Sequence, residues 1–357
     1  MKIFVEENIP NLAAALSRCG EITRFNGREL KREDLLPGCD ALFIRSTTKA
    51  GRELLEGTNV KFIGTATAGT DHVDKEYLAE QRIGFSSAPG SNANSVAEYV
   101  VYAILKWARI TKSELSDKKI GIIGYGNIGR LVAGYSERLG MAVYINDPPL
   151  REMGFKFPEQ YLYAGKPDIF EECDIVTNHV PLNIGGPFNT SLMIDDDLIG
   201  RMKKNALFIH TSRGKVVHEE ALLKRLNQQD LFAAVDVWEN EPDINIPMAY
   251  KCILATPHIA GYSRDGKLKG SLKMAEAFES YFECVPDYSA IKSELMEILP
   301  LSADDFKQDR AFELLKSRRM LDNDTREFLK LTELDSDKRK KKFDLQRKNY
   351  PVRRESL

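Results

Sequence analysis

The chain has 357 residues, more than a single hydrophobic core usually serves, so two or three domains are expected. Hydrophobic residues make up 43% and charged residues 29% of the sequence, and no apolar run approaches the roughly 20 residues of a membrane span. The net charge of -2 excludes the basic excess of a general nucleic-acid binder, and the first residues turn acidic too early for a secretory signal. These features predict a cytoplasmic protein without a membrane or nucleic-acid partner.

Short apolar runs alternate with helical patterns through the first 285 residues, which is typical of βα units and a parallel sheet. A long amphipathic pattern over 95–110 separates the third run from the fourth and predicts a domain boundary near residue 95. A second long helical pattern over 263–283 would return the chain to its first domain. The predicted strands cover 2–5, 41–44, 62–64, 120–123, 142–145, 175–178, 206–210, 233–235 and 253–255.

Beyond Pro286 the strand signals fade, and helical stretches are predicted over 304–319 and 325–331. This part of the sequence includes a basic run at 338–342. We interpret that run as a solvated helix face or a disordered tail.

No metal site or disulfide framework is predicted. The five cysteines are odd in number, far apart and without a Cys-x-x-Cys pair, so we expect buried, small apolar residues. The acidic run at 195–197 points its side chains in different directions, and it is better interpreted as the capped start of a helix than as a ligand cluster.

A Gly-x-Gly-x-x-Gly motif lies between an apolar strand run and a helical pattern. Gly124 would make the tight turn, Gly126 would let a pyrophosphate approach the backbone, and Gly129 would let helix and strand pack closely. The next strand ends at Asp147, which fits the carboxylate that binds the adenosine ribose hydroxyls and repels a 2'-phosphate. The motif therefore predicts NAD as the cofactor.

Three further segments, each after an apolar strand run, carry the groups that oxidation of a hydroxy acid needs. His258 is our candidate for the general acid–base catalyst, because an imidazole can take and return the proton of the substrate hydroxyl. Glu241 would bind the other ring nitrogen, and Arg213 would hold the substrate carboxylate with two hydrogen bonds. His179 also follows a strand, but we assign it no catalytic role, and His72 is interpreted as a loop histidine that could contact substrate.

Four ordered motifs together resemble the D-2-hydroxyacid dehydrogenase family over residues 1 to about 285. Further segments, at 44–49, 64–72, 147–149, 258–262 and 343–354, are similar to a member that acts on a small phosphorylated hydroxy acid. The resemblance implies NAD-dependent hydride transfer at C2 of such a substrate. The four motifs are Gly-Tyr-Gly-Asn-Ile-Gly at 124–129, His-Thr-Ser-Arg-Gly at 210–214, Asp-Val-Trp-Glu-Asn-Glu-Pro at 236–242 and Pro-His-Ile-Ala-Gly at 257–261.

The resemblance also implies the architecture: two Rossmann-like or flavodoxin-like α/β lobes with parallel sheets, and a C-terminal α+β dimerisation domain. Residues 1–95, completed by the helix over 263–285, would form the substrate-binding lobe. Residues 96–262 would form the NAD-binding Rossmann domain, and 286–357 would join two chains in a homodimer. The implied substrate contacts are Ser46, Thr67 and Tyr262, and the implied cofactor contacts are Asn127, Ile128, Asp147, Thr177, Asp236 and Gly261.

A phosphorylated acid needs a cation besides Arg213, because one guanidinium cannot serve both the carboxylate and the phosphate. Arg45, beside Ser46, is the nearest candidate in the sequence. Arg347, Arg353 and Arg354 are candidates if the tail of a partner chain folds over the site.

Two other functions stay open on the sequence. One is another member of the same family, such as a phosphoglycerate dehydrogenase. The other, from a different class, is an NAD(H)-sensing binding protein without turnover. The complete set of Arg213, Glu241 and His258 argues against the second.

Overall fold

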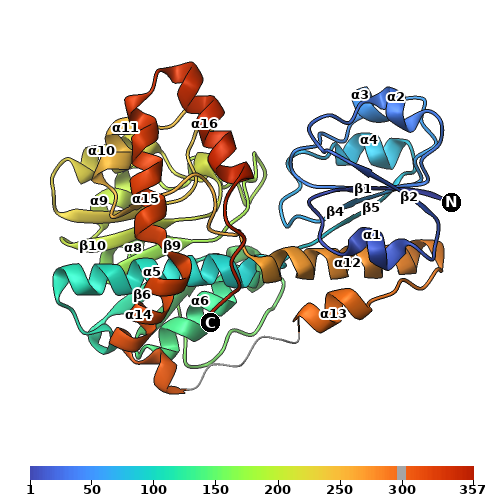
Figure 1. The fold of residues 1–357 in the computed structure, drawn as a ribbon. Helices are drawn as coiled ribbons and strands as arrows, with labels where there is room; N and C mark the ends of the chain where they lie inside the picture. Colours follow the sequence, from blue (N-terminus) through green and yellow to red (C-terminus); the bar gives the residue numbers. More distant parts are fainter. Residues whose placement is uncertain (296–302) are drawn as a thin grey trace. The chain divides into compact units, whose positions relative to one another are not determined.

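The computed structural model describes residues 1–295 and 303–357, which form two compact α/β units (Figure 1). Among these residues, unit 1 comprises 1–92 and 263–295, and unit 2 comprises 93–262 and 303–357. The predicted division into domains at 1–95, 96–262 and 286–357 stays a prediction. Each unit contains one sheet of parallel strands, as the βα pattern predicts.

Unit 1 has a five-stranded sheet with the order β2-β1-β3-β4-β5. The sequence missed its two edge strands, because their mixed polar and apolar residues form no apolar run and are largely half-buried or exposed. The strands are β1 (Lys2–Glu6), β2 (Glu21–Phe25), β3 (Ala41–Ile44), β4 (Phe62–Thr65) and β5 (Gly84–Ser87).

Helices cover both faces of this sheet (Figure 1). Alternate residues of each central strand enter opposite cores: Phe43 packs with Met274 and Phe278 of the long returning helix, whereas Ile44 packs on the other side. The first face carries α1 (Leu12–Leu16) and α12 (Arg264–Phe282), and the second carries α2 (Arg32–Leu35), α3 (Arg52–Leu55) and α4 (Lys75–Glu80).

Unit 2 has a seven-stranded sheet with the order β12-β11-β10-β9-β6-β7-β8. The glycine motif follows the central strand β6, and the three candidate catalytic motifs follow the adjacent strands β10, β11 and β12. The sequence missed only the two-residue edge strand β8. The strands are β6 (Lys119–Ile123), β7 (Ala142–Asn146), β8 (Leu162–Tyr163), β9 (Ile175–Asn178), β10 (Ala206–His210), β11 (Leu231–Val235) and β12 (Leu254–Ala255).

Helices cover the second sheet on both faces as well. On one face lie α5 (Ala93–Thr111) and α6 (Asn127–Arg138), and the buried side of α5 supplies a large part of that core. On the other face lie α8 (Lys166–Glu172), α9 (Asp196–Arg201), α10 (Glu219–Leu226) and α11 (Ile246–Lys251). The short elements are α7 (Pro148–Glu152), η1 (Leu115–Asp117), η2 (Gly214–Val216), η3 (Ala303–Phe306) and η4 (Lys330–Glu333).

The C-terminal segment corrects one expectation, because its described residues contain helices and no strand in place of the α+β fold. Its sequence is rich in Leu, Lys and Arg and poor in β-branched residues, which favours helix. In this chain the segment from 303 onward is part of unit 2, and its Phe312 and Phe343 enter the two cores of that unit. Its role in joining two chains stays a prediction. The helices are α13 (Ser289–Leu295), α14 (Gln308–Arg319), α15 (Leu321–Leu329) and α16 (Ser336–Lys348).

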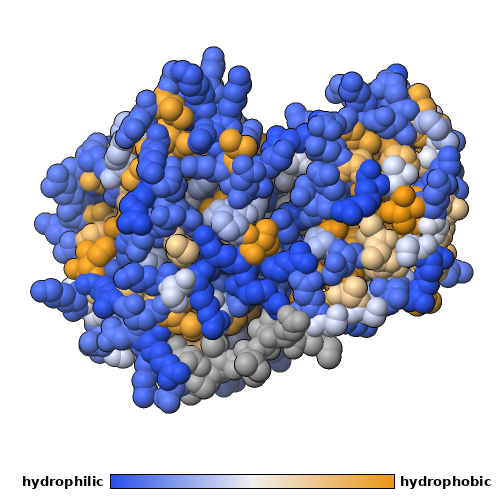
Figure 2. Space-filling model, in the orientation of Figure 1, coloured by the Kyte–Doolittle hydropathy of each residue, from blue (hydrophilic) through white to orange (hydrophobic). Residues whose placement is uncertain are grey.

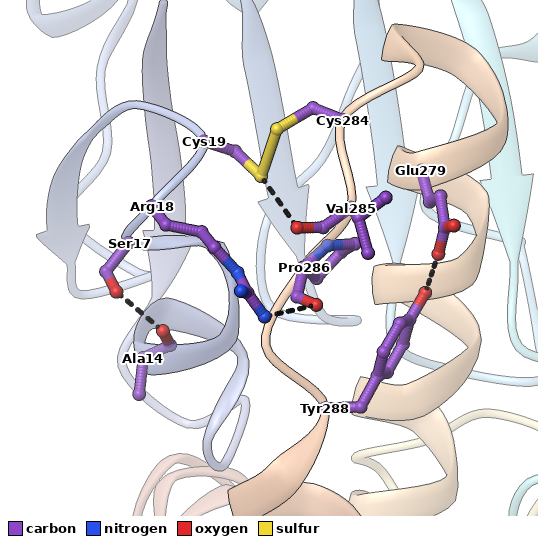
Figure 3. Close-up of a disulfide and its surroundings, with 9 residues drawn as sticks. All are labelled: Ala14, Ser17, Arg18, Cys19, Glu279, Cys284, Val285, Pro286 and Tyr288. Atoms are coloured by element: carbon purple, nitrogen blue, oxygen red, sulfur yellow. Dashed lines mark hydrogen bonds between the residues drawn. A yellow bond between two sulfur atoms is a disulfide. The ribbon is translucent and has the colours of Figure 1, made fainter.

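A disulfide in unit 1 corrects the expectation that all five cysteines are unpaired. Cys19, just after α1, is bonded to Cys284, just beyond α12 (Figure 3). Arg18 donates to the carbonyl of Pro286 at 2.9 Å beside it. The two cysteines are 265 residues apart in the sequence, so no local spacing could reveal the pair. Cys39 and Cys173 are buried as expected, and Cys252 is half-buried.

The visible surface is mostly hydrophilic, with hydrophobic residues in small separate groups (Figure 2). Among the described residues, no helix combines the length and apolar character that crossing a bilayer requires.

Candidate active site

The glycine motif forms a turn that suits a dinucleotide. Gly124 follows β6 with a φ of 93°, which favours glycine. A side chain at Gly129 would overlap the carbonyl oxygen of Gly124, whereas a Cβ on Gly126 would meet no atom within 4 Å. Gly126 and Asn127 are exposed at the start of α6. The backbone is therefore open where a pyrophosphate would meet the N-terminus of a long helix.

Asp147 lies at the end of β7, and its carboxylate holds two backbone groups. One oxygen accepts a hydrogen bond from the N–H of Tyr125 in the glycine turn at 2.8 Å. The other caps α7 by accepting from the N–H of Leu150 at 3.0 Å. The side chain expected to bind the ribose thus also ties the glycine turn to the next strand.

We expect Asp147→Ala to lower the ratio of kcat/KM with NAD to kcat/KM with NADP by at least about 10-fold, since the charge that repels a 2'-phosphate is lost. Loss of the cap should also cost about 1 kcal/mol of stability. Asp195→Ala is the matched control, because Asp195 caps α9 through the N–H of Leu198 in the same unit. Initial rates with both cofactors test this, and a parent protein that used NADP as readily as NAD would contradict it.

The three candidate catalytic motifs emerge at one edge of the second sheet. Strands β10, β11 and β12 are parallel neighbours, so Arg213, Glu241 and His258 follow strand ends on the same side. Nδ1 of His258 lies 2.8 Å from Oε2 of Glu241. Nη1 of Arg213 donates to the carbonyl of Ser212 at 2.9 Å.

Glu241 is held as a carboxylate in this arrangement. Burial would raise its pKa, but the charge and hydrogen bond of His258 and the N–H of Trp238 outweigh burial, so the pKa lies below its ordinary value. The N–H of Trp238 donates to the second oxygen of Glu241 at 2.9 Å. Because Nδ1 of His258 is occupied by Glu241, Nε2 is the ring nitrogen left for a substrate proton.

The backbone of His258 is strained. Its φ is 58°, in the left-handed region, which costs a residue with a Cβ about 1–3 kcal/mol. The N–H of His258 donates to the carbonyl of Asp236 at 2.7 Å. Such a conformation persists only where the surroundings fix it, and it marks this loop as a candidate functional segment.

The two other histidines near these strands are poor proton carriers. Burial lowers the pKa of His179 to about 3 and the pKa of His210 to about 4. His210 also lies 3.1 Å from the amide nitrogen of Asn178, and His179 lies 3.1 Å from the hydroxyl of Thr177. Both stay neutral at physiological pH, which supports the choice of His258.

The predicted substrate residues of unit 1 lie where β3 and β4 end. The backbone N–H of Arg45 donates to the buried carboxylate of Glu6 at 2.7 Å, and Ser46 next to it is exposed. The hydroxyl of Thr67 is 2.8 Å from that of Thr65, which lies 2.9 Å from Nε2 of His72. Burial lowers the pKa of His72 to about 4.

Lys267, on α12, is a candidate that the sequence analysis missed. Burial, together with the positive charges of Arg45 and Arg264, lowers its pKa to about 8. The helix comes close to β4 at this point, because a Cβ on Gly270 would lie 3.0 Å from the carbonyl oxygen of Ala66. Lys267 and Arg45 are 222 residues apart, and only their mutual repulsion in the folded unit identifies the pair.

Tyr262 contacts the C-terminal segment of its own chain. Its ring packs edge-on against Tyr350, with ring centres 5.9 Å apart. Tyr350 and Arg353 both bind Asp324. Arg347 acts on another site residue, because its charge contributes to lowering the pKa of Glu241. Two of the three tail arginines considered from the sequence therefore lie near site residues within one chain.

Comparison with known proteins identifies the family of this chain. Residues 96–260 match the model of the D-isomer specific 2-hydroxyacid dehydrogenase NAD-binding domain. The erythronate-4-phosphate dehydrogenase of Citrobacter koseri is 42% identical over 282 residues, which cover 79% of this chain and 73% of that protein. The enzyme of the same name from Edwardsiella ictaluri is 38% identical over 99% of this chain and 93% of its own length.

Solved structures agree on the fold. An NAD+-bound 3-phosphoglycerate dehydrogenase from Entamoeba histolytica is 26% identical, with a TM-score of 0.66 over 80% of this chain and 97% of that chain. An NAD-dependent formate dehydrogenase from Staphylococcus aureus in complex with NAD is 25% identical, with a TM-score of 0.64 over 79% and 96%. The chain belongs to the D-isomer specific 2-hydroxyacid dehydrogenase family and is an NAD-dependent oxidoreductase.

Proposed function

We propose that the protein oxidises 4-phospho-D-erythronate at C2 to 2-oxo-3-hydroxy-4-phosphobutanoate, a step in the biosynthesis of pyridoxal 5'-phosphate (vitamin B6). The observation that carries the chemistry is the pair of His258 and Glu241, 2.8 Å apart, beyond strands adjacent to that of Arg213. The choice of substrate is supported by the name of relatives about 40% identical over most of the chain.

The residues divide the reaction between them. NAD+, when bound, accepts the hydride that leaves C2. Nε2 of His258 takes the hydroxyl proton as the C2–O bond becomes a carbonyl, and Glu241 stabilises the imidazolium that results. Arg213 binds the substrate carboxylate through two N–H groups and stabilises charge on the reacting oxygen. The proton then leaves to solvent, and the imidazole is ready for another turnover.

Within unit 1, Arg45 and Lys267 are the cations that we assign to the substrate phosphate. Two positive groups that repel each other are stabilised together when a doubly charged anion binds. Ser46 and Thr67, at the ends of the same strands, would add neutral hydrogen bonds.

We expect Lys267→Gln to raise KM for the phosphorylated acid about 10- to 100-fold, because a charge-assisted hydrogen bond is lost, and to change KM for an unphosphorylated 2-hydroxy acid little. A lysine loses its charge as pH rises through its pKa of about 8, so the parent's KM should rise above that pH. The variant should lack this rise. Lys273→Gln on the same helix is the control, and equal KM changes for both acids would contradict the assignment.

Residues 286–357 are, by our proposal, the part that joins two chains in a homodimer, and the enzyme works in the cytoplasm. The resemblance to the family supports both points. Light scattering on the intact chain and on a chain ending at Pro286 tests the first, because a truncated protein that stayed dimeric would exclude the segment as the interface.

The decisive assay follows the absorbance of reduced cofactor with NAD and a panel of 2-hydroxy acids. We expect the highest kcat/KM with 4-phosphoerythronate and lower values with 3-phosphoglycerate and with unphosphorylated acids. A preference for another acid would keep the chemistry and change the substrate, whereas no turnover with any acid would sink the proposal.

A further inference from the structure

The loop that carries His258 is fixed from one side by a buried carboxylate. Asp236 is 1% exposed, and its two oxygens accept hydrogen bonds from the N–H groups of Ile259 at 2.8 Å and Ala260 at 2.9 Å. The hydroxyl of Thr256 also donates to Asp236 at 2.6 Å. These bonds fix the backbone N–H groups of the two residues that follow His258.

A backbone carbonyl of the same loop is held by groups from two other parts of the chain. The carbonyl oxygen of Ala260 accepts from the hydroxyl of Ser95 at 2.8 Å and from Nη2 of Arg319 at 3.1 Å. Nη1 of Arg319 also donates to the oxygen of Ser95 at 2.9 Å, which closes a ring of three hydrogen bonds. The guanidinium therefore makes a forked contact that a single ammonium cannot reproduce.

Arg319 is itself held in place deep in unit 2. It is the last residue of α14 and is 2% exposed, and it pairs with Glu98, which is fully buried, at 3.3 Å. Glu98 also accepts from the N–H groups of Ser356 and Leu357. The C-terminal segment thus contributes both the guanidinium and part of its support, outside the 96–260 region of the family match.

We propose that Arg319 is a positioning residue for His258: by holding the carbonyl of Ala260 opposite Asp236, it keeps the left-handed backbone of His258 and aims its imidazole. The inference rests on the proposed role of His258 and extends it to a segment assigned so far only to dimerisation. A residue in a strained backbone conformation keeps that conformation only while neighbouring backbone groups are fixed. If the carbonyl of Ala260 is released, the backbone of His258 can relax to an unstrained conformation.

The test compares Arg319→Lys with Arg225→Lys. Both arginines are buried in unit 2, and Arg225 likewise donates to a backbone carbonyl, that of Met202 at 3.2 Å, and pairs with Asp230. We expect Arg319→Lys to lower kcat about 10-fold with KM for the hydroxy acid within about 3-fold, and to speed amide hydrogen exchange at Ile259 and Ala260. Arg225→Lys should lower thermal stability similarly and change neither property.

Each outcome decides the point. If Arg319→Lys loses stability like the control but keeps its kcat and its exchange rates at 259 and 260, Arg319 is only structural. If Arg319→Lys does not fold, Ser95→Ala removes the other donor to Ala260, and unchanged kcat and exchange there would overturn the inference equally. Amide exchange needs no turnover. A parent protein that was inactive with every hydroxy acid would reject the proposed function, and the exchange rates at 259 and 260 would still show whether Arg319 fixes this loop.

Discussion

His258→Ala should lower kcat by roughly 10³- to 10⁴-fold while NAD binds almost as tightly as to the parent, because the imidazole acts on the proton and not on the dinucleotide. The expectation rests on the pair with Glu241 and on the two competing histidines, whose pKa values of about 3 and about 4 keep them neutral. Single-turnover rates of NAD reduction measure the chemical step, and fluorescence titration measures cofactor binding.

His258→Gly separates the imidazole from the backbone conformation. Its φ of 58° is easy for glycine, so this variant should be more stable than His258→Ala by about 1 kcal/mol. The space left by the ring should also let added imidazole restore part of the rate. His218→Gln, on a half-buried histidine before α10, is the control and should keep its rate within about 2-fold. A near-normal kcat in His258→Ala would remove His258 from the mechanism.

Local sequence patterns predicted the parts of the site that depend on strand ends. Parallel strands bring their carboxyl ends to one edge, so an apolar run followed by Arg213 or His258 already places these groups. The glycine motif was equally informative, because Gly124 and Gly129 are required by a positive φ and by close helix–strand packing. These features need no knowledge of distant residues.

The sequence could not predict interactions between residues far apart in the chain. The disulfide of Cys19 with Cys284, the repulsion between Arg45 and Lys267, and the bond from Arg319 to Ala260 each join segments that only the fold brings together. The hydrogen bonds of Asp236 were also beyond prediction from the sequence. The resemblance implies a cofactor contact, but both oxygens of its carboxylate already bind the backbone of 259 and 260, which no motif could reveal.

Arg213→Lys should lower kcat/KM for the hydroxy acid roughly 10³-fold, although the positive charge remains. A guanidinium presents two parallel N–H groups to a carboxylate, and an ammonium offers only a point charge on a flexible stem, so both the orientation of the substrate and the stabilisation of its reacting oxygen are lost. The loss should appear in kcat as well as in KM, since the contact to the reacting oxygen strengthens as charge develops.

A matched control distinguishes this role from a general need for arginine. Arg201→Lys alters an exposed ion pair with Asp197 on α9 in the same unit and should leave kcat/KM within about 2-fold. Because Arg213 also donates to the carbonyl of Ser212, its variant should be checked for stability by thermal unfolding. If Arg213→Lys changed only KM, the guanidinium would bind the substrate carboxylate without acting on the reacting oxygen; if it changed neither kcat nor KM, the carboxylate would have to be bound by another group.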